Sequence, residues 1–232
     1  ENVFFHIDEE VAFSDIKAYE DYLKKNNLYQ EGKPKIAIVS GIHDPFSGNK
    51  AHIDSIIISL QKSGLNVYPF ASFGKRVEFL EQINPDAVIY FPHGRLQMTN
   101  PEQTIDWLKE KNIPIFTPIS VIQLEEDWLK DPMGMFGGFM GQTIVMPELD
   151  GAVYPYVLIA QEKRNDGMVV FKTIPDRLKK FTQIVNNFIN LKKKNNQDKK
   201  VAIYYFKGQG QNSLVAQGLE TSSSLYNFLK RM

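Results

Sequence analysis

Apolar residues recur along this chain in short runs that alternate with amphipathic stretches. The run from Ile36 to Val39 precedes a loop rich in Gly, Pro, Asn and Ser, and a second run covers residues 65–70. Between them, residues 49–62 carry apolar side chains three and four positions apart, which is the spacing of a one-sided helix. Strand, helix and strand in this order predict a βαβ unit, with Asn49 as the helix cap.

The alternation continues after this unit. The pattern predicts helices over 75–82, 101–111, 121–130 and 175–191, and strands over 87–91, 113–118, 152–160 and 168–171, with a polar turn at 164–167. Strands that alternate with helices at this spacing form parallel sheets covered on both faces. The predicted fold class is therefore α/β, a doubly wound parallel sheet of the Rossmann or flavodoxin-like kind.

The pattern also divides the chain into segments. We predict a lead-in over 1–34, with a strand at 3–7 and a helix capped by Ser14, a doubly wound domain over 35–173, a connecting helix and basic linker over 174–200, and the start of a second α/β unit over 201–232. The last segment holds one predicted strand, 201–206, and one helix, 221–231. A lone strand and helix cannot bury their own apolar faces. Either this pair docks onto the preceding sheet, or the chain is an N-terminal to middle fragment of a longer polypeptide, which is the reading we favour.

Composition narrows the class of protein. The 27 basic and 27 acidic side chains balance, so neither nucleic acid nor a charged membrane surface is the expected partner. The chain has no cysteine, which excludes disulfides, thiolate catalysis and zinc sites built on sulfur. Its apolar runs are shorter than the roughly 20 residues that span a bilayer. We expect a cytoplasmic protein without a membrane span.

Histidines mark the expected functional edge. His43 and His93 each follow a predicted strand, and His52 lies near the start of the helix after the His43 loop. Ligands of open α/β sheets bind beyond the carboxyl ends of the strands, so both loops should reach the same edge. There an imidazole can ligate a metal or move a proton near neutral pH. The alternative is that these are loop histidines bonded to backbone or water.

Further candidates surround this edge. Arg95 can bind a carboxylate in bidentate fashion, or it is a surface residue. Residues 131–146 hold four Gly, four Met and two Phe, and Met135 and Met140 are expected to line an apolar ligand cleft, unless the segment is core. In the sequence PELDG, Asp150 is expected to serve turn geometry.

The first loop does not fit a nucleotide site. Six residues separate Gly41 from Gly48, and Asn49 stands between Gly48 and Lys50, which excludes a Walker loop. The same loop lacks the run of Ser and Thr that would hold the phosphate of a flavin in a flavodoxin-like electron carrier. We therefore expect no cofactor in this fragment.

Four segments in the same order carry a family resemblance. They are SGIHDPFSGNKAHIDSIIISLQKSGLNVYPFAS, VMPELDGAVYP, IPDRLKKFTQIVNNFINLKKK followed by KKVAIYYF, and GLETSSSLYNFLKRM. Together they resemble the large, substrate-binding subunit of the cobaltochelatase and magnesium chelatase family over nearly the whole chain. Such subunits are much longer than 232 residues, which agrees with a fragment.

The resemblance implies binding of a tetrapyrrole, a corrin or a porphyrin, during ATP-dependent insertion of a metal. The handled metal would be Co, Mg or Fe, while ATP and Mg would be used by AAA-type ATPase partner subunits. The other expected partners are the remaining domains of the same polypeptide. Substrate contacts are expected from His43, Asn49, His93, Arg95, Met135 and Met140. No catalytic residue is carried over, because the family's metal step belongs to parts beyond this chain.

Two alternatives stay open on these residues. The segment can be a scaffold that docks the ATPase partners without touching tetrapyrrole. A relative that removes iron from haem would use the same architecture.

Overall fold

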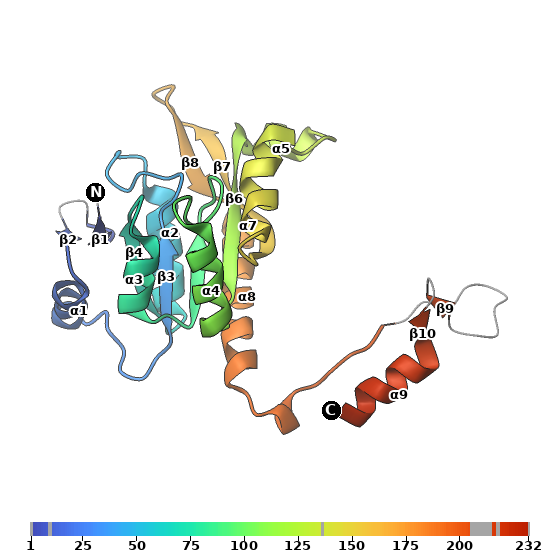
Figure 1. The fold of residues 1–232 in the computed structure, drawn as a ribbon. Coiled ribbons are helices and arrows are strands. Elements are labelled where there is room, and N and C mark those ends of the chain that lie inside the picture. The colour runs from blue at the N-terminus through green and yellow to red at the C-terminus, as the bar shows by residue number, and fades with distance from the viewer. Residues whose placement is uncertain (1, 9–10, 136, 205–214, 217–218, 232) are drawn as a thin grey trace. The chain divides into compact units, whose positions relative to one another are not determined.

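The computed structural model describes residues 2–8, 11–135, 137–204, 215–216 and 219–231. The chain forms two compact units, Glu1–Lys193 and Lys194–Met232 (Figure 1). Within the described residues, no helix combines the length and apolar character needed to cross a membrane.

The first unit is built on a mixed sheet that has eight strands in the described part of the chain. Their order is β2-β1-β4-β3-β5-β6-β7-β8. The bounds are β1 Val3–Phe5, β2 Ala12–Phe13, β3 Lys35–Val39, β4 Asn66–Ala71, β5 Ala87–Tyr90, β6 Ile115–Leu124, β7 Val153–Lys163 and β8 Val169–Thr173. Strands β4, β3, β5, β6 and β7 are parallel, and counted along the chain they stand in the flavodoxin-like order 2-1-3-4-5. The predicted α/β fold is confirmed, with antiparallel strands added at both edges.

Helices cover both faces of this sheet (Figure 1). On one face, α2 (Ala51–Lys62) and α8 (Pro175–Lys193) pack on side chains such as Ile36 and Ile38. On the other, α1 (Ile16–Lys25), α3 (Arg76–Ile83) and α4 (Pro101–Lys111) pack on Ala37 and Val39. Successive residues of a strand point to opposite faces, so β3 has no polar alternation because both of its faces are buried.

Strand β6 is longer than expected. The predicted helix over 121–130 is wrong in its first part, because β6 continues to Leu124 and only α5 (Glu125–Lys130) is helical. The strand continues because β7 pairs along it with register shifts and because Ile119 and Val121 are buried against Phe139. Tertiary pairing therefore overrides the local pattern.

The lead-in belongs to the sheet. β1 pairs with β4, and β2 pairs with β1. Helix α1 is capped by Asp15, whose side chain accepts the Ala18 N–H at 2.9 Å, rather than by Ser14. Asn49 is not a cap either, since α2 begins at Ala51 after Lys50.

Residues 137–148 are helical. They form α6 (Gly137–Met140), the π-helical turn η1 (Gly141–Val145) and α7 (Met146–Glu148). In the second unit, η2 (Asn196–Asp198) precedes the pair β9 (Val215–Ala216) and β10 (Leu219–Glu220), and α9 spans Thr221–Arg231 as predicted. Residues 201–204 of the predicted strand 201–206 carry no strand, and its remainder lies outside the described residues.

His6, just after β1, makes the protein sensitive to acid. Burial, and then the charge of Lys50, lower its pKa to about 4. The unfolded chain, with an ordinary histidine pKa near 6.5, takes up the proton first as the pH falls. Above pH 6.5 His6 is neutral in both states and costs the folded protein no stability on this account. Between pH 6.5 and pH 4 its protonation in the unfolded chain lowers the free energy of unfolding by about 3 kcal/mol.

The free energy of unfolding should fall less in His6→Gln than in the natural protein between pH 7.5 and pH 4. The expected difference between the two falls is about 3 kcal/mol. Urea unfolding of both proteins at the two pH values measures the difference. Parallel pH profiles would show that His6 is not the group responsible.

Candidate functional site

The loops after β3 and β5 meet at the carboxyl edge of the sheet. The Ile42 N–H donates to the carbonyl oxygen of Phe91 at 3.2 Å. Gly41 lies so close to Phe91 that a Cβ on it would stand 1.8 Å from that oxygen, and its φ is +58°. In a sheet of this order, β3 and β5 flank the topological switch point, where ligands bind. The expected approach of the His43 and His93 turns is therefore present.

His43 and His52 form a buried pair beneath this edge. Their ring centroids are 4.3 Å apart, and both side chains are buried. The Nε2 atom of His43 lies 2.7 Å from the Ser120 hydroxyl oxygen. Both nitrogens of His52 are without a hydrogen-bond partner among the described residues. Phe91 and Phe171 close the cluster with ring contacts to His43 at 5.3 and 5.1 Å.

Burial keeps both imidazoles uncharged. It lowers the pKa of His43 to about 3, with a further contribution from His52, and that of His52 to about 4. A charged imidazole in this cluster would lack both water and a counter-charge. At neutral pH the pair consists of two neutral rings.

His93 differs from His43 in its surroundings. It is exposed, and its backbone N–H donates to the Tyr90 hydroxyl at 3.2 Å. The two predicted histidines thus share one edge of the sheet, but His43 faces inward while His93 is open to solvent. The structure brings His43 together with His52, not with His93.

Arg95 already has a carboxylate partner. Its Nε donates to Asp150 Oδ1 at 2.8 Å and its Nη2 to the same oxygen, while the Leu96 N–H donates to Oδ2 at 2.7 Å. The Asp150 side chain is only 1% exposed. Asp150 therefore does more than shape a turn, because it ties PELDG to the His93 turn.

Asn49 holds the first loop against the edge strand. Its Oδ1 accepts the backbone N–H of Phe171 on β8 at 3.1 Å. This bond is made to β8 and not to the N-terminus of α2, which explains why Asn49 does not cap that helix.

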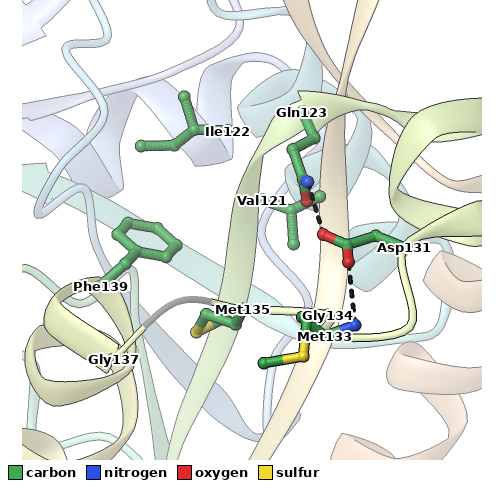
Figure 2. A pocket seen from close by; sticks show the side chains of 9 residues that line it. All are labelled: Val121, Ile122, Gln123, Asp131, Met133, Gly134, Met135, Gly137 and Phe139. Atoms are coloured by element: carbon green, nitrogen blue, oxygen red, sulfur yellow. Dashed lines mark hydrogen bonds between the residues drawn. The ribbon is translucent and has the colours of Figure 1, made fainter.

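A cavity of about 450 Å³ lies at the carboxyl end of β6 (Figure 2). It is lined by Val121, Ile122, Gln123, Asp131, Met133, Gly134, Met135, Gly137 and Phe139. Asp131 shapes its wall by accepting from Gln123 Nε2 at 3.0 Å and from the Met133 N–H at 2.9 Å. Met135, which the sequence predicted to line an apolar cleft, is one of these lining residues. Met140 is exposed and is not part of the lining.

Large apolar side chains gather along the same edge. Phe73 follows β4, Phe46 follows β3, Met98 follows β5, and Ile122 and Met133 stand at the end of β6; all are exposed. The Gly94 N–H donates to the Gln142 carbonyl oxygen at 2.9 Å, which joins the His93 turn to the methionine-rich segment. We call the exposed side chains of Phe46, Phe73, Met98, Ile122 and Met133 the apolar rim. Of the five, Ile122 and Met133 line the cavity together, which makes the cavity the candidate interaction site at this edge.

Sequence reasoning missed part of this arrangement. Phe73 lies three residues after the predicted strand 65–70, so the expectation that functional residues follow the carboxyl ends of strands could have found it. Ser120 and Phe171 carried no signal, because their roles depend on β6 and β8 lying beside the first loop.

Comparisons with known proteins agree with the fold. A protein of Methanocaldococcus jannaschii is 34% identical over 55% of this chain and 11% of its own length. A magnesium-chelatase subunit of Chlorobaculum parvum is 25% identical over 98% of this chain and 19% of its own length. The aerobic cobaltochelatase subunit CobN of Pseudomonas aeruginosa is 21% identical over 88% of this chain and 18% of its own length.

Among solved structures, the catalytic subunit of cobaltochelatase from Mycobacterium tuberculosis matches with a TM-score of 0.55 and 16% identity, over 70% of this chain and 15% of that one. The chain spans less than a fifth of the length of each of these proteins. The family model described as CobN/Magnesium Chelatase matches residues 1–232. The chain therefore belongs to the CobN/magnesium chelatase family.

Proposed function

We propose that this chain is a fragment of a chelatase large subunit whose sheet edge forms one wall of a tetrapyrrole cleft. The proposal takes from the family that a corrin or porphyrin is held during ATP-dependent metal insertion, with Co, Mg or Fe as the metal substrate. AAA-type ATPase partner subunits would supply the energy, and the remaining domains of the polypeptide would form the rest of the cleft.

The apolar rim and its cavity are the observation that carries this proposal. A tetrapyrrole presents a broad, flat and mainly apolar face. The cavity volume of about 450 Å³ falls in the usual range of ligand pockets, and methionine side chains adapt to flat apolar ligands. Ile122 and Met133 are exposed residues of the cavity lining and are assigned the macrocycle contact, together with Met135 of the same lining.

Polar contacts are assigned by exposure. His93 is open to solvent and remains a candidate contact to the macrocycle. His43 is enclosed, and Arg95 is engaged with Asp150, so neither is assigned a contact with the macrocycle or its propionates. Asn49 is occupied by β8 and Met140 lies outside the cavity lining, so neither is included.

Titration of the 232-residue chain with deuteroporphyrin tests the proposal. Trp128 is half-buried and packs against the cluster that includes Met135, so a bound porphyrin should quench its fluorescence. We expect the double variant Ile122→Glu with Met133→Glu to bind at least about tenfold more weakly, because two carboxylates would be desolvated under the macrocycle.

Leu149→Glu is the control for position, because it places one such carboxylate on an exposed apolar residue at the opposite end of β6, near Ile115. Its affinity should stay unchanged. Absence of quenching in the natural chain, or equal affinities in all three proteins, would contradict the proposal. Co-purification with the ATPase partners in that case would favour the scaffold alternative.

A further inference from the structure

The sulfur of this chain belongs to methionine alone and is concentrated near the cavity. The chain has seven methionines and no cysteine, and four of the seven fall within residues 131–146. Met133 and Met135 both line the cavity at the carboxyl end of β6. A thioether can be oxidised to a sulfoxide, and dedicated reductases reverse the reaction. Reversible oxidation of sulfur in this chain can therefore occur only at methionine, and two of the candidates stand in the cavity lining.

Met133 is the sulfur of the lining that an oxidant in solution reaches most readily. It is 83% exposed, whereas Met135 is half-buried and packs against a cluster that includes Phe139. The Met135 sulfur also lies 3.5 Å from the Thr143 hydroxyl oxygen, from which it accepts a weak hydrogen bond. Because susceptibility to oxidation rises with exposure, Met133 should be oxidised before Met135.

The polar groups beside Met133 do not suit a sulfoxide oxygen. The Met133 N–H donates to Asp131 Oδ1 at 2.9 Å, and the Gln123 Nε2 donates to Oδ2 at 3.0 Å (Figure 2). The bond from Gln123, and then the bond from the Met133 N–H, lower the pKa of the Asp131 carboxyl, so Asp131 is ionised and can only accept. A sulfoxide oxygen at Met133 would lose its hydration under a macrocycle without gaining a free side-chain donor of the lining in return.

We propose that Met133 is a reversible oxidation site, at which a hydroperoxide switches macrocycle binding off. The inference rests on the proposed function, because it concerns the same cavity. In the step, the thioether sulfur attacks one oxygen of hydrogen peroxide, the O–O bond breaks and an S–O bond forms. The sulfur gives up two electrons, and the other peroxide oxygen leaves as water. A reductase reverses the step with two thiols, which form a disulfide while the sulfoxide oxygen leaves as water.

The test compares each protein with itself before and after mild treatment with hydrogen peroxide. Deuteroporphyrin affinity is measured in the dark from the absorbance of the porphyrin, so that oxidation of tryptophan does not enter the readout. Oxidation of the natural chain should weaken binding at least about tenfold, because an acceptor without a donor is desolvated under the macrocycle. Methionine sulfoxide reductases A and B should restore the affinity, and peptide mass spectrometry should find Met133 oxidised before Met135.

Met133→Leu separates this site from the other methionines. Leucine has no sulfur to oxidise, so the affinities of this variant before and after peroxide should agree, whatever affinity it starts from. Met168→Leu is the matched control, because Met168 is 59% exposed but directly precedes β8, outside the cavity lining. This variant should keep the full loss of affinity. Both substitutions are at exposed positions, and circular dichroism checks that the variants fold.

An affinity that stays unchanged once Met133 is oxidised would overturn the inference. So would an equal loss in Met133→Leu, or a loss that the reductases do not reverse, since the latter would be damage and not a switch. A natural chain that binds no porphyrin before oxidation would contradict the proposed function itself, and the switch with it. Failure of the switch alone is thus distinguishable, because the untreated chain would still bind.

Discussion

Gly41→Ala is expected to lower the free energy of unfolding by about 3–5 kcal/mol. The new Cβ would lie 1.8 Å from the Phe91 carbonyl oxygen and 2.9 Å from its carbon, both backbone atoms that cannot move away cheaply. The φ of +58° adds a further cost of about 1–2 kcal/mol for any residue with a Cβ. Urea unfolding followed by circular dichroism measures the loss.

Gly48→Ala is the matched control in the same loop. Gly48 also has a positive φ, +74°, but a Cβ there meets nothing within 4 Å. We expect a loss of about 1 kcal/mol, which is the backbone cost alone. Equal losses in the two variants would mean that the close approach of the β3 loop to β5 does not hold the edge together.

Asp150→Ala is expected to cost about 3 kcal/mol and to loosen the His93 turn. The substitution leaves Arg95, whose side chain is only 14% exposed, without its counter-charge, and it removes the acceptor of the Leu96 N–H. Breaking a buried ion pair from one side is strongly destabilising, because the remaining charge stays desolvated. Thermal or urea unfolding gives the change in stability, and amide exchange of residues 93–96 reports the loosening.

Glu148→Ala is the comparison for this variant. It removes the other carboxylate of PELDG, which is exposed, and should change stability by less than about 0.5 kcal/mol. Similar effects of both substitutions would indicate that the motif acts through turn geometry and not through the buried ion pair.

Gly41→Ala and Asp150→Ala both disturb the packing of loops at the carboxyl edge of the sheet. The carboxyl edge of the sheet is irregular backbone, and close contacts between its loops and the neighbouring elements hold it in place. Gly41 sets the β3 loop against the end of β5, and Asp150 ties the β5 loop to the segment after α7. If the proposed porphyrin site lies at this edge, loss of either contact is expected to weaken porphyrin binding as well as stability.

The sequence alone determined the layered α/β core. Apolar runs such as 36–39 and the helical spacing over 49–62 depend on the two periods of strand and helix, which are local properties of the chain. His43 and His93 each follow a predicted parallel strand, so both were expected at the carboxyl end of the sheet. The order of elements along the chain decides which end a loop occupies. The resemblance to chelatase subunits, which the family match confirmed, was likewise read from ordered segments of sequence.

Only the tertiary structure decided which way those side chains face. His43 turns inward because Ser120 and Phe171 arrive from strands more than seventy residues away along the chain, whereas His93 is exposed among the described residues. Arg95 pairs with Asp150 across 55 positions, which local pattern cannot foresee. The extension of β6 likewise needed β7 beside it. Burial and pairing at this edge are long-range events, so periodicity locates the edge while packing determines its chemistry.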